Sequence, residues 1–114
     1  AHAESLGLAL DIRQSNHQGH LIDWLHEAGE VASAVVLNAG GYSHTSVAIR
    51  DAVAAIAIPV IEVHLSNVHA REDFRRTSLL APVANGSITG FGAFGYLLAL
   101  DAAAHLCKGS ADAE

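Results

Sequence analysis

The sequence predicts an α/β fold in which helices cover both faces of a parallel sheet. Strand-like and helix-like patterns alternate along the 114 residues. A short, continuously apolar run at 34–37 is typical of a parallel strand buried on both faces. No linker-like stretch, repeat or low-complexity tract interrupts the alternation. We therefore expect residues 1–114 to form one domain, since the length is a common domain size.

Two strands and a helix are predicted in the first part of the chain. Residues 8–13 carry apolar side chains at every second position, the period of a strand exposed on one face. Residues 21–28 place apolar side chains on one helical stripe, and Gly29 follows where a helix stop is expected. The apolar run at 34–37 is the second strand, and the sequence Asn-Ala-Gly-Gly at 38–41 ends it.

The alternation continues through the middle of the chain. Ser43 or Thr45 can cap a helix through Ala55, in which apolar residues recur every three or four positions. Pro59 opens a strand at 60–64, a position that tolerates a residue without an N–H group.

Shorter elements and a long helix are expected in the last third. Residues 73–76 suggest a helical turn, and the Gly-rich stretch 86–92 holds a short strand around Ile88. An apolar helix follows at 93–107, and the tail beyond Lys108 should be frayed.

Composition excludes several classes of partner. The net charge is −6 with only six Lys and Arg, which disfavours nucleic acid, because binding phosphates requires clustered cations. No apolar run approaches the roughly 20 residues of a membrane-spanning helix, and the N-terminus lacks the pattern of a signal peptide. The lone Cys107 cannot form an internal disulfide, which fits a reducing compartment, so we expect a cytoplasmic protein.

Polar side chains gather after each predicted strand. Ligands of open parallel sheets bind beyond the carboxyl ends of the strands. The residues found there are Arg13, Gln14, Ser15, Asn16 and His17 after the first strand, Asn38, Gly40, Gly41, Tyr42, Ser43 and His44 after the second, and His64, Leu65, Ser66, Asn67, His69, Arg71 and Arg75 after the third. The three loops together predict a site on one edge of the sheet.

Several of these residues allow a structural as well as a functional interpretation. His44 fits a first helical turn, and His64 ends a buried strand, where an apolar residue is more usual. Glu62, in the same strand, must find a partner or shift its pKa upward; it either orients His64 or faces a helix end. Asn38 either binds a ligand or satisfies backbone groups of its loop.

Other chemistries have weaker support. The chain has eight His, but no pair matches a zinc signature. Neither a phosphate-binding loop nor a nucleophile elbow is present. Proton transfer on a small polar acid remains as the expected chemistry.

Four stretches resemble the type II 3-dehydroquinate dehydratases. They are RQSNHQGHLIDWLHEA (13–28), LNAGGYSHTSVAIRDA (37–52), IPVIEVHLSNVHAREDFRRTS (58–78) and GFGAFGYLLAL (90–100). The resemblance covers nearly the whole chain in order, and HLSNVHARE together with NAGGYSHTS is its most specific part.

The resemblance implies a flavodoxin-like three-layer α/β/α fold, assembled as trimers that pack into dodecamers. It also implies anti elimination of water from 3-dehydroquinate to give 3-dehydroshikimate, a step of the shikimate pathway to aromatic amino acids, without a metal or cofactor. In the family, a Tyr base on a mobile N-terminal loop, assisted by an Arg, removes a proton next to the ketone. A His then protonates the departing hydroxyl.

The family's functional residues map onto positions of this chain. His64 resembles the general acid, with Glu62 as its orienting carboxylate. The substrate contacts implied are Asn38 with the backbone of Leu65 and Ser66 for the carboxylate, His44 and Arg75 for the ring hydroxyls, Asp51 for a neighbouring subunit's site, and, on the same rim, Arg13 and Asn16.

The first central strand of the family and its lid with the Tyr and Arg have no counterpart in this chain. We expect an N-terminally truncated domain, in which Tyr42 and Tyr96 do not replace the base, because they belong to a turn and to the last helix. The alternative function is a non-catalytic subunit that binds a small hydroxy acid or serves assembly. A receiver domain or flavin carrier is a weaker third interpretation, based on fold analogy.

Overall fold

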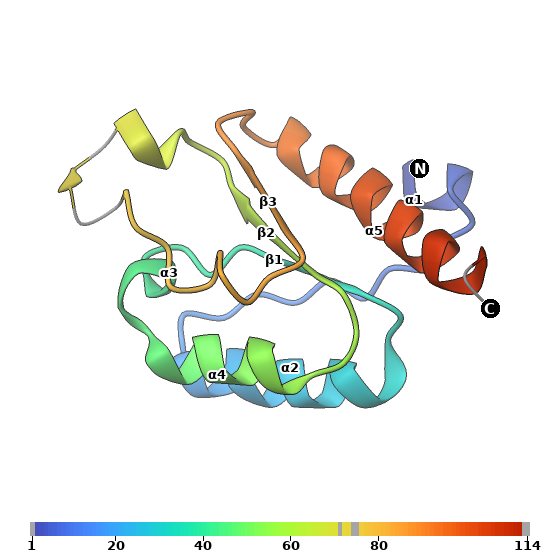
Figure 1. The fold of residues 1–114 in the computed structure, drawn as a ribbon, viewed down its shortest axis with the longest axis horizontal. Helices are drawn as coiled ribbons and strands as arrows, with labels where there is room; N and C mark the ends of the chain where they lie inside the picture. Colours follow the sequence, from blue (N-terminus) through green and yellow to red (C-terminus); the bar gives the residue numbers. More distant parts are fainter. Residues whose placement is uncertain (1, 71, 74–75, 113–114) are drawn as a thin grey trace.

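The computed structural model describes residues 2–70, 72–73 and 76–112, whose arrangement is shown in Figure 1. In chain order the elements are α1 (His2–Ser5), α2 (Gln18–Val31), β1 (Val35–Leu37), α3 (Tyr42–Thr45), α4 (Val47–Ala55), β2 (Val60–His64), the 3-10 helix η1 (Val68–Ala70), β3 (Gly86–Thr89) and α5 (Phe94–Asp112). The expected α/β fold is confirmed, with three of the predicted strands in place.

The three strands form one parallel sheet in the order β1-β2-β3. The register aligns Leu37 with Glu62, and Glu62 with Ser87. Because parallel strands all end at the same edge, the loops that follow β1 and β2 begin side by side. The sheet therefore brings Asn38, directly after β1, close to the end of β2 at His64.

Helices cover both faces of the sheet: α2 and α4 lie on one side, and α5 with the short α1 on the other (Figure 1). The core on the α2 and α4 side includes Val60, whereas the core under α5 includes Ile61 and Val63. Side chains alternate between the faces of a strand. Glu62 and His64 therefore point to the same side as Val60, toward the layer of α2 and α4. None of the helices in the described residues is both long and apolar enough to cross a bilayer.

The strand predicted over residues 8–13 is wrong. This segment has no regular secondary structure, and it does not join the sheet formed by the described residues. Two of its apolar side chains, Leu10 and Ile12, are 52% and 79% exposed. Alternating hydrophobicity indicates which side chains favour burial, but a strand forms only when a neighbouring strand accepts its hydrogen bonds.

Gly29 does not end the second helix as predicted. α2 continues to Val31, with Ala32 as its C-cap. A Cβ atom at position 29 would lie 2.7 Å from Cγ2 of Ile56, just beyond α4. Glycine at this position therefore permits close packing of two helical segments, and its conformational freedom is not used to stop the helix.

The other helix boundaries also differ from the sequence prediction. Ser46 caps α4, accepting a hydrogen bond from Ile49 N at 3.0 Å, so the caps predicted at Ser43 or Thr45 are wrong. Ser43 and Thr45 lie in the separate turn α3. α5 runs to Asp112 and is therefore longer than the helix predicted at 93–107. The turn expected at 73–76 includes residues 74 and 75, which lie outside the described part.

Candidate active site

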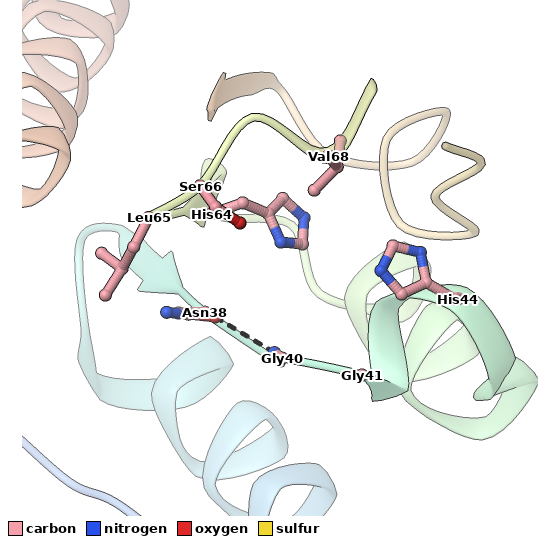
Figure 2. A pocket seen from close by; sticks show the side chains of 8 residues that line it. All are labelled: Asn38, Gly40, Gly41, His44, His64, Leu65, Ser66 and Val68. Carbon is pink, nitrogen blue, oxygen red and sulfur yellow. Dashed lines mark hydrogen bonds between the residues drawn. The ribbon is translucent and has the colours of Figure 1, made fainter. Parts of the chain in front are cut away.

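A cavity of about 210 Å³ opens at the carboxyl edge of the sheet, between the loops that follow β1 and β2 (Figure 2). Its lining residues are Asn38, Gly40, Gly41, His44, His64, Leu65, Ser66 and Val68. The volume is below the roughly 300 Å³ at which pockets for drug-sized ligands usually begin, which favours a small ligand. Its polar lining favours one with several oxygens.

The end of β2 supplies one wall of the cavity. The carbonyl groups of His64 and Leu65 accept hydrogen bonds from Gly90 N at 3.2 Å and Gly92 N at 2.8 Å. These bonds fix the path of the chain as it leaves the sheet. Leu65 and Ser66 are therefore held in the lining by the Gly-rich segment that follows β3.

The loop after β1 supplies the opposite wall. Asn38 Oδ1 accepts a hydrogen bond from Gly40 N at 3.1 Å, and Asn38 Nδ2 donates to Tyr96 Oη at 3.0 Å. The first contact depends on a tight turn in which Gly40 has φ of +59°, a conformation that favours glycine. Two contacts of opposite polarity fix which side of the amide carries the oxygen.

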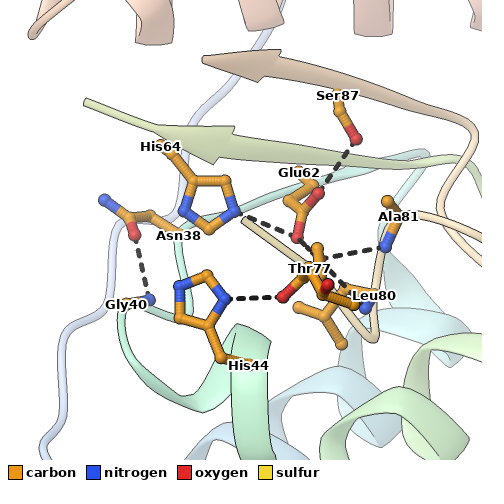
Figure 3. Close-up of polar contacts among 10 residues, drawn as sticks. Asn38, Gly40, His44, Glu62, His64, Thr77, Leu80, Ala81 and Ser87 are labelled. Atoms are coloured by element: carbon orange, nitrogen blue, oxygen red, sulfur yellow. Dashed lines mark hydrogen bonds and ion pairs between the residues drawn. The ribbon is translucent and has the colours of Figure 1, made fainter. Parts of the chain in front are cut away.

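Glu62 and His64 are both buried, with exposed fractions of 2% and 6%. Nε2 of His64 lies 3.1 Å from Oε2 of Glu62, within ion-pair distance (Figure 3). The contact is not a straight hydrogen bond, and Nε2 is one of two buried side-chain atoms without one among the described residues; the other is Ser43 Oγ. The second ring nitrogen, Nδ1, lies on the opposite side of the imidazole and is directed away from Glu62.

The Glu62 carboxylate has two further partners, of which Figure 3 labels Ser87. The Ser87 hydroxyl donates to Oε1 at 2.9 Å, and the Ser78 hydroxyl donates to Oε2. Burial on its own would raise the pKa of the Glu62 carboxyl, but the contacts with His64, Ser78 and Ser87 together hold this pKa below its usual value of 4.5. A negative charge therefore stands beside the His64 ring at neutral pH.

A second imidazole faces His64 across the site. His44 comes from α3, and its ring centroid lies 6.0 Å from that of His64, with 20° between the ring planes. Nδ1 of His44 donates to the carbonyl oxygen of Thr77 at 2.8 Å. Because a carbonyl only accepts, Nδ1 carries the proton in the neutral ring, and this bond fixes the tautomer.

Most of the predicted site residues meet at this cavity. Asn38, His44, His64, Leu65 and Ser66 line it, and Glu62 stands behind His64. Asp51 is exposed on α4, where its carboxylate pairs with Arg50 at 3.1 Å, and it does not line this cavity. Arg75, like Arg71, lies outside the described residues.

The loop after the predicted first strand does not join the cavity. Arg13 pairs with Asp11 and Glu27, each at 2.9 Å, and its guanidinium lies over the ring of Trp24. The backbone carbonyl of Asn16 accepts a hydrogen bond from the hydroxyl of Tyr42 at 2.9 Å. The two residues lie apart from the cavity because the segment that was expected to carry them to the sheet edge is not a strand.

Three residues at the site were given no role from the sequence: Thr77, Ser78 and Ser87. Thr77 and Ser78 end the 58–78 stretch of the resemblance, but nothing in the sequence relates them, or Ser87, to Glu62 or His44. Ser87 can be recognised as a partner of Glu62 only when the register of β2 and β3 is known, because the two residues are direct neighbours in the ladder. No group of three or more His, Cys, Asp or Glu side chains is placed to hold a metal ion within the described residues.

Comparison with known proteins agrees with this geometry. The family described as Dehydroquinase class II matches residues 1–104. The 3-dehydroquinate dehydratase of Mesorhizobium japonicum is 62% identical over 101 residues, which cover 88% of this chain and 70% of the relative. 3-Dehydroquinate dehydratase 1 of Agrobacterium fabrum is 60% identical over 97 residues, 85% of this chain and 67% of the relative.

Solved structures show the same likeness. The type II dehydroquinase of Propionibacterium acnes superposes with a TM-score of 0.87 and 38% identity, over 91% of this chain and 76% of that chain. The type II dehydroquinase of Butyrivibrio crossotus has a TM-score of 0.86 and 45% identity, over 89% of this chain and 71% of that chain. The expected flavodoxin-like fold is confirmed by these neighbours. The protein therefore belongs to the dehydroquinase class II family.

Proposed function

We propose that the cavity binds 3-dehydroquinate and that His64 is the general acid in its dehydration to 3-dehydroshikimate. The protein is a hydro-lyase of the class II dehydroquinases, as its family and its named relatives indicate. The relatives are dehydratases, so they favour the enzyme over the non-catalytic binding subunit.

The observation that carries the assignment is the buried contact between His64 and Glu62. An ionised carboxylate beside Nε2 holds the ring in one orientation. Nδ1 then faces the cavity, where it can donate a proton to the hydroxyl group that leaves as water. When the C–O bond breaks, its electrons go to that oxygen, and His64 is left neutral.

The other lining residues account for binding. The side-chain amide of Asn38 and the backbone N–H groups of Leu65 and Ser66 suit the substrate carboxylate, because donors at the end of a strand neutralise an anion without a cation. His44, with its tautomer fixed by Thr77, suits a ring hydroxyl. We assign Arg75 to the ring hydroxyls by its resemblance to the family.

The base that removes the proton next to the ketone is not one of the cavity-lining side chains in this proposal. The Tyr42 hydroxyl donates to Asn16 and the Tyr96 hydroxyl accepts from Asn38, so both have structural contacts. We assign the base to a Tyr, assisted by an Arg, on an N-terminal lid like that of the family.

We also propose that the protein works in the cytoplasm as trimers that pack into dodecamers. The exposed position of Asp51, away from the cavity of its own chain, fits a role at a neighbouring subunit's site. The chain has a single cysteine, Cys107, and therefore no internal disulfide, a composition common in reducing compartments.

Substitution of His64 tests the proposal in the full-length protein. We expect His64→Ala to lower kcat by about 10²–10⁴-fold, the usual contribution of a positioned acid, while KM changes little. His26→Ala is the matched control, because His26 is exposed on α2 and does not line the cavity. Turnover is followed by the absorbance of the conjugated product, and near-normal kcat in His64→Ala would refute the assignment.

A further inference from the structure

We propose that Ser78 and Ser87 are positioning residues for this reaction, which hold the Glu62 carboxylate in the orientation that aligns His64 with the cavity. The inference rests on the proposed role of His64 as the acid. It extends the site from the buried pair, Glu62 and His64, to a group of four. The two added residues lie far from β2 in the sequence.

The fold places one hydroxyl at each carboxylate oxygen. Ser87 is the ladder neighbour of Glu62 on β3, so the two side chains project from the same face of the sheet. Its hydroxyl reaches Oε1 at 2.9 Å. Ser78, in the loop before β3, donates to Oε2, the oxygen that also faces His64 Nε2. With both oxygens bonded, the carboxylate cannot rotate about its terminal torsion without losing a contact.

The bonding of Ser78 also determines the direction of its hydrogen bond to Glu62. Ser78 Oγ accepts hydrogen bonds from Leu80 N and Ala81 N, both at 3.1 Å. A hydroxyl has two acceptor sites and one proton. Because both acceptor sites are occupied, only the proton remains for Glu62, which must accept it. This arrangement favours the ionised carboxylate, in agreement with the lowered pKa of Glu62.

The same loop also controls the second imidazole. Thr77, next to Ser78, offers the carbonyl oxygen that fixes the tautomer of His44. One short segment, 77–81, therefore orients His44 directly and His64 through Glu62. A displacement of this segment would change both rings together.

A purely structural role is the alternative, since any buried carboxylate needs hydrogen-bond donors. The two interpretations differ in what is lost when one hydroxyl is removed. A structural role predicts a lower stability with an unchanged pH dependence of kcat. A positioning role predicts that Glu62 becomes easier to protonate, so that turnover is lost at a higher pH on the acid side.

The sharpest comparison is Ser87→Val against Ser87→Thr in the full-length enzyme. Valine and threonine have nearly the same shape and differ by the hydroxyl group. Ser87 is exposed on β3, and valine removes the hydrogen-bond donor that threonine keeps. Ser78→Ala is the second variant, and Ser33→Val, at the opposite end of β1, is the control for loss of a serine hydroxyl.

We expect the acid limb of the kcat–pH profile to move upward by about one pH unit in Ser87→Val and at least as far in Ser78→Ala, because each removes one hydrogen bond to a charged group. KM should stay within about twofold, since neither residue lines the cavity. Ser87→Thr and Ser33→Val should keep the wild-type profile.

An unchanged acid limb in Ser87→Val would overturn the inference, whatever happens to its thermal stability. Ser87→Val carries this test even if Ser78→Ala fails to fold. The proposed function is tested separately by His64→Ala. An inactive His64→Ala together with unshifted serine variants would remove only the present inference, whereas an active His64→Ala would remove the acid assignment itself.

Discussion

Replacement of Gly29 by alanine should destabilise the protein, although the same change usually stabilises a helix. Gly29 lies inside α2, where alanine is favoured over glycine by about 1 kcal/mol. The new Cβ atom, however, would lie 2.7 Å from Cγ2 and 3.2 Å from Cβ of Ile56. Carbon atoms do not approach to 2.7 Å, so one of the two residues must move.

The magnitude follows from the nature of the neighbour. Cγ2 of Ile56 is bonded directly to Cβ, so it moves only if χ1 rotates or the backbone after α4 shifts. Overpacking of this kind typically costs about 1–3 kcal/mol. Set against the gain in helix propensity, the free energy of unfolding of Gly29→Ala should fall by about 1 kcal/mol.

Urea unfolding at a single protein concentration measures the effect. Gly19→Ala, on the same helix, is the control: nothing lies within 4 Å of its new Cβ, and it should raise the free energy of unfolding by about 0.5–1 kcal/mol. In an Ile56→Ala background, which lacks Cγ2 but keeps the Cβ at 3.2 Å, Gly29→Ala should be less destabilising than in the wild type. If Gly29→Ala raises stability in the wild-type background as much as Gly19→Ala does, the packing argument is refuted.

Two further predictions concern charge and assembly. The folded-state pKa of Glu62 is below 4.5, so its ionised form contributes stability that is present above pH 4.5 and is lost as the pH falls through the folded value. Glu62→Gln removes this contribution. It should therefore flatten the acid side of the plot of unfolding free energy against pH. An acid slope equal to that of the wild type would contradict this. Asp51→Ala should lower turnover in the assembled enzyme. An activity assay measures the turnover, and the mass in solution shows whether the assembly is kept. A fully active monomer would show that no neighbouring site needs Asp51.

Local sequence patterns predict much of the candidate site. The apolar run ending at 37 and the strand at 60–64 mark two neighbouring strand ends, and ligands bind at such ends in parallel sheets. Residues i and i+2 of a strand share a face, so Glu62 and His64 had to lie on the same side of β2. Both inferences need only the strands themselves. A cavity opens at the expected edge, and the contact between Glu62 and His64 agrees with their shared face.

Other features depend on partners distant in the sequence. The pattern at 8–13 is that of a strand, but no neighbour accepts its hydrogen bonds in the described part of the chain. The sequence predicts a helix stop at Gly29, yet the helix continues to Val31. Glycine is present because Ile56 packs where a side chain at position 29 would lie. At 8–13 the local preference lacks the neighbouring strand that it requires, whereas at Gly29 a tertiary contact explains why the residue is a glycine.

Three features follow from local sequence patterns: the helices and the three strands of the sheet, the sheet edge at which the cavity opens, and the shared face of Glu62 and His64. These depend on periods of two and about four residues, which are local properties of the chain. The surroundings of the buried Glu62 carboxylate, in contrast, are known only from the three-dimensional fold. Its hydroxyl partners lie 16 and 25 residues away, and their approach depends on strand register and on the return of the 77–81 loop. Register and loop closure are set by packing of the whole core, which no short stretch of sequence contains.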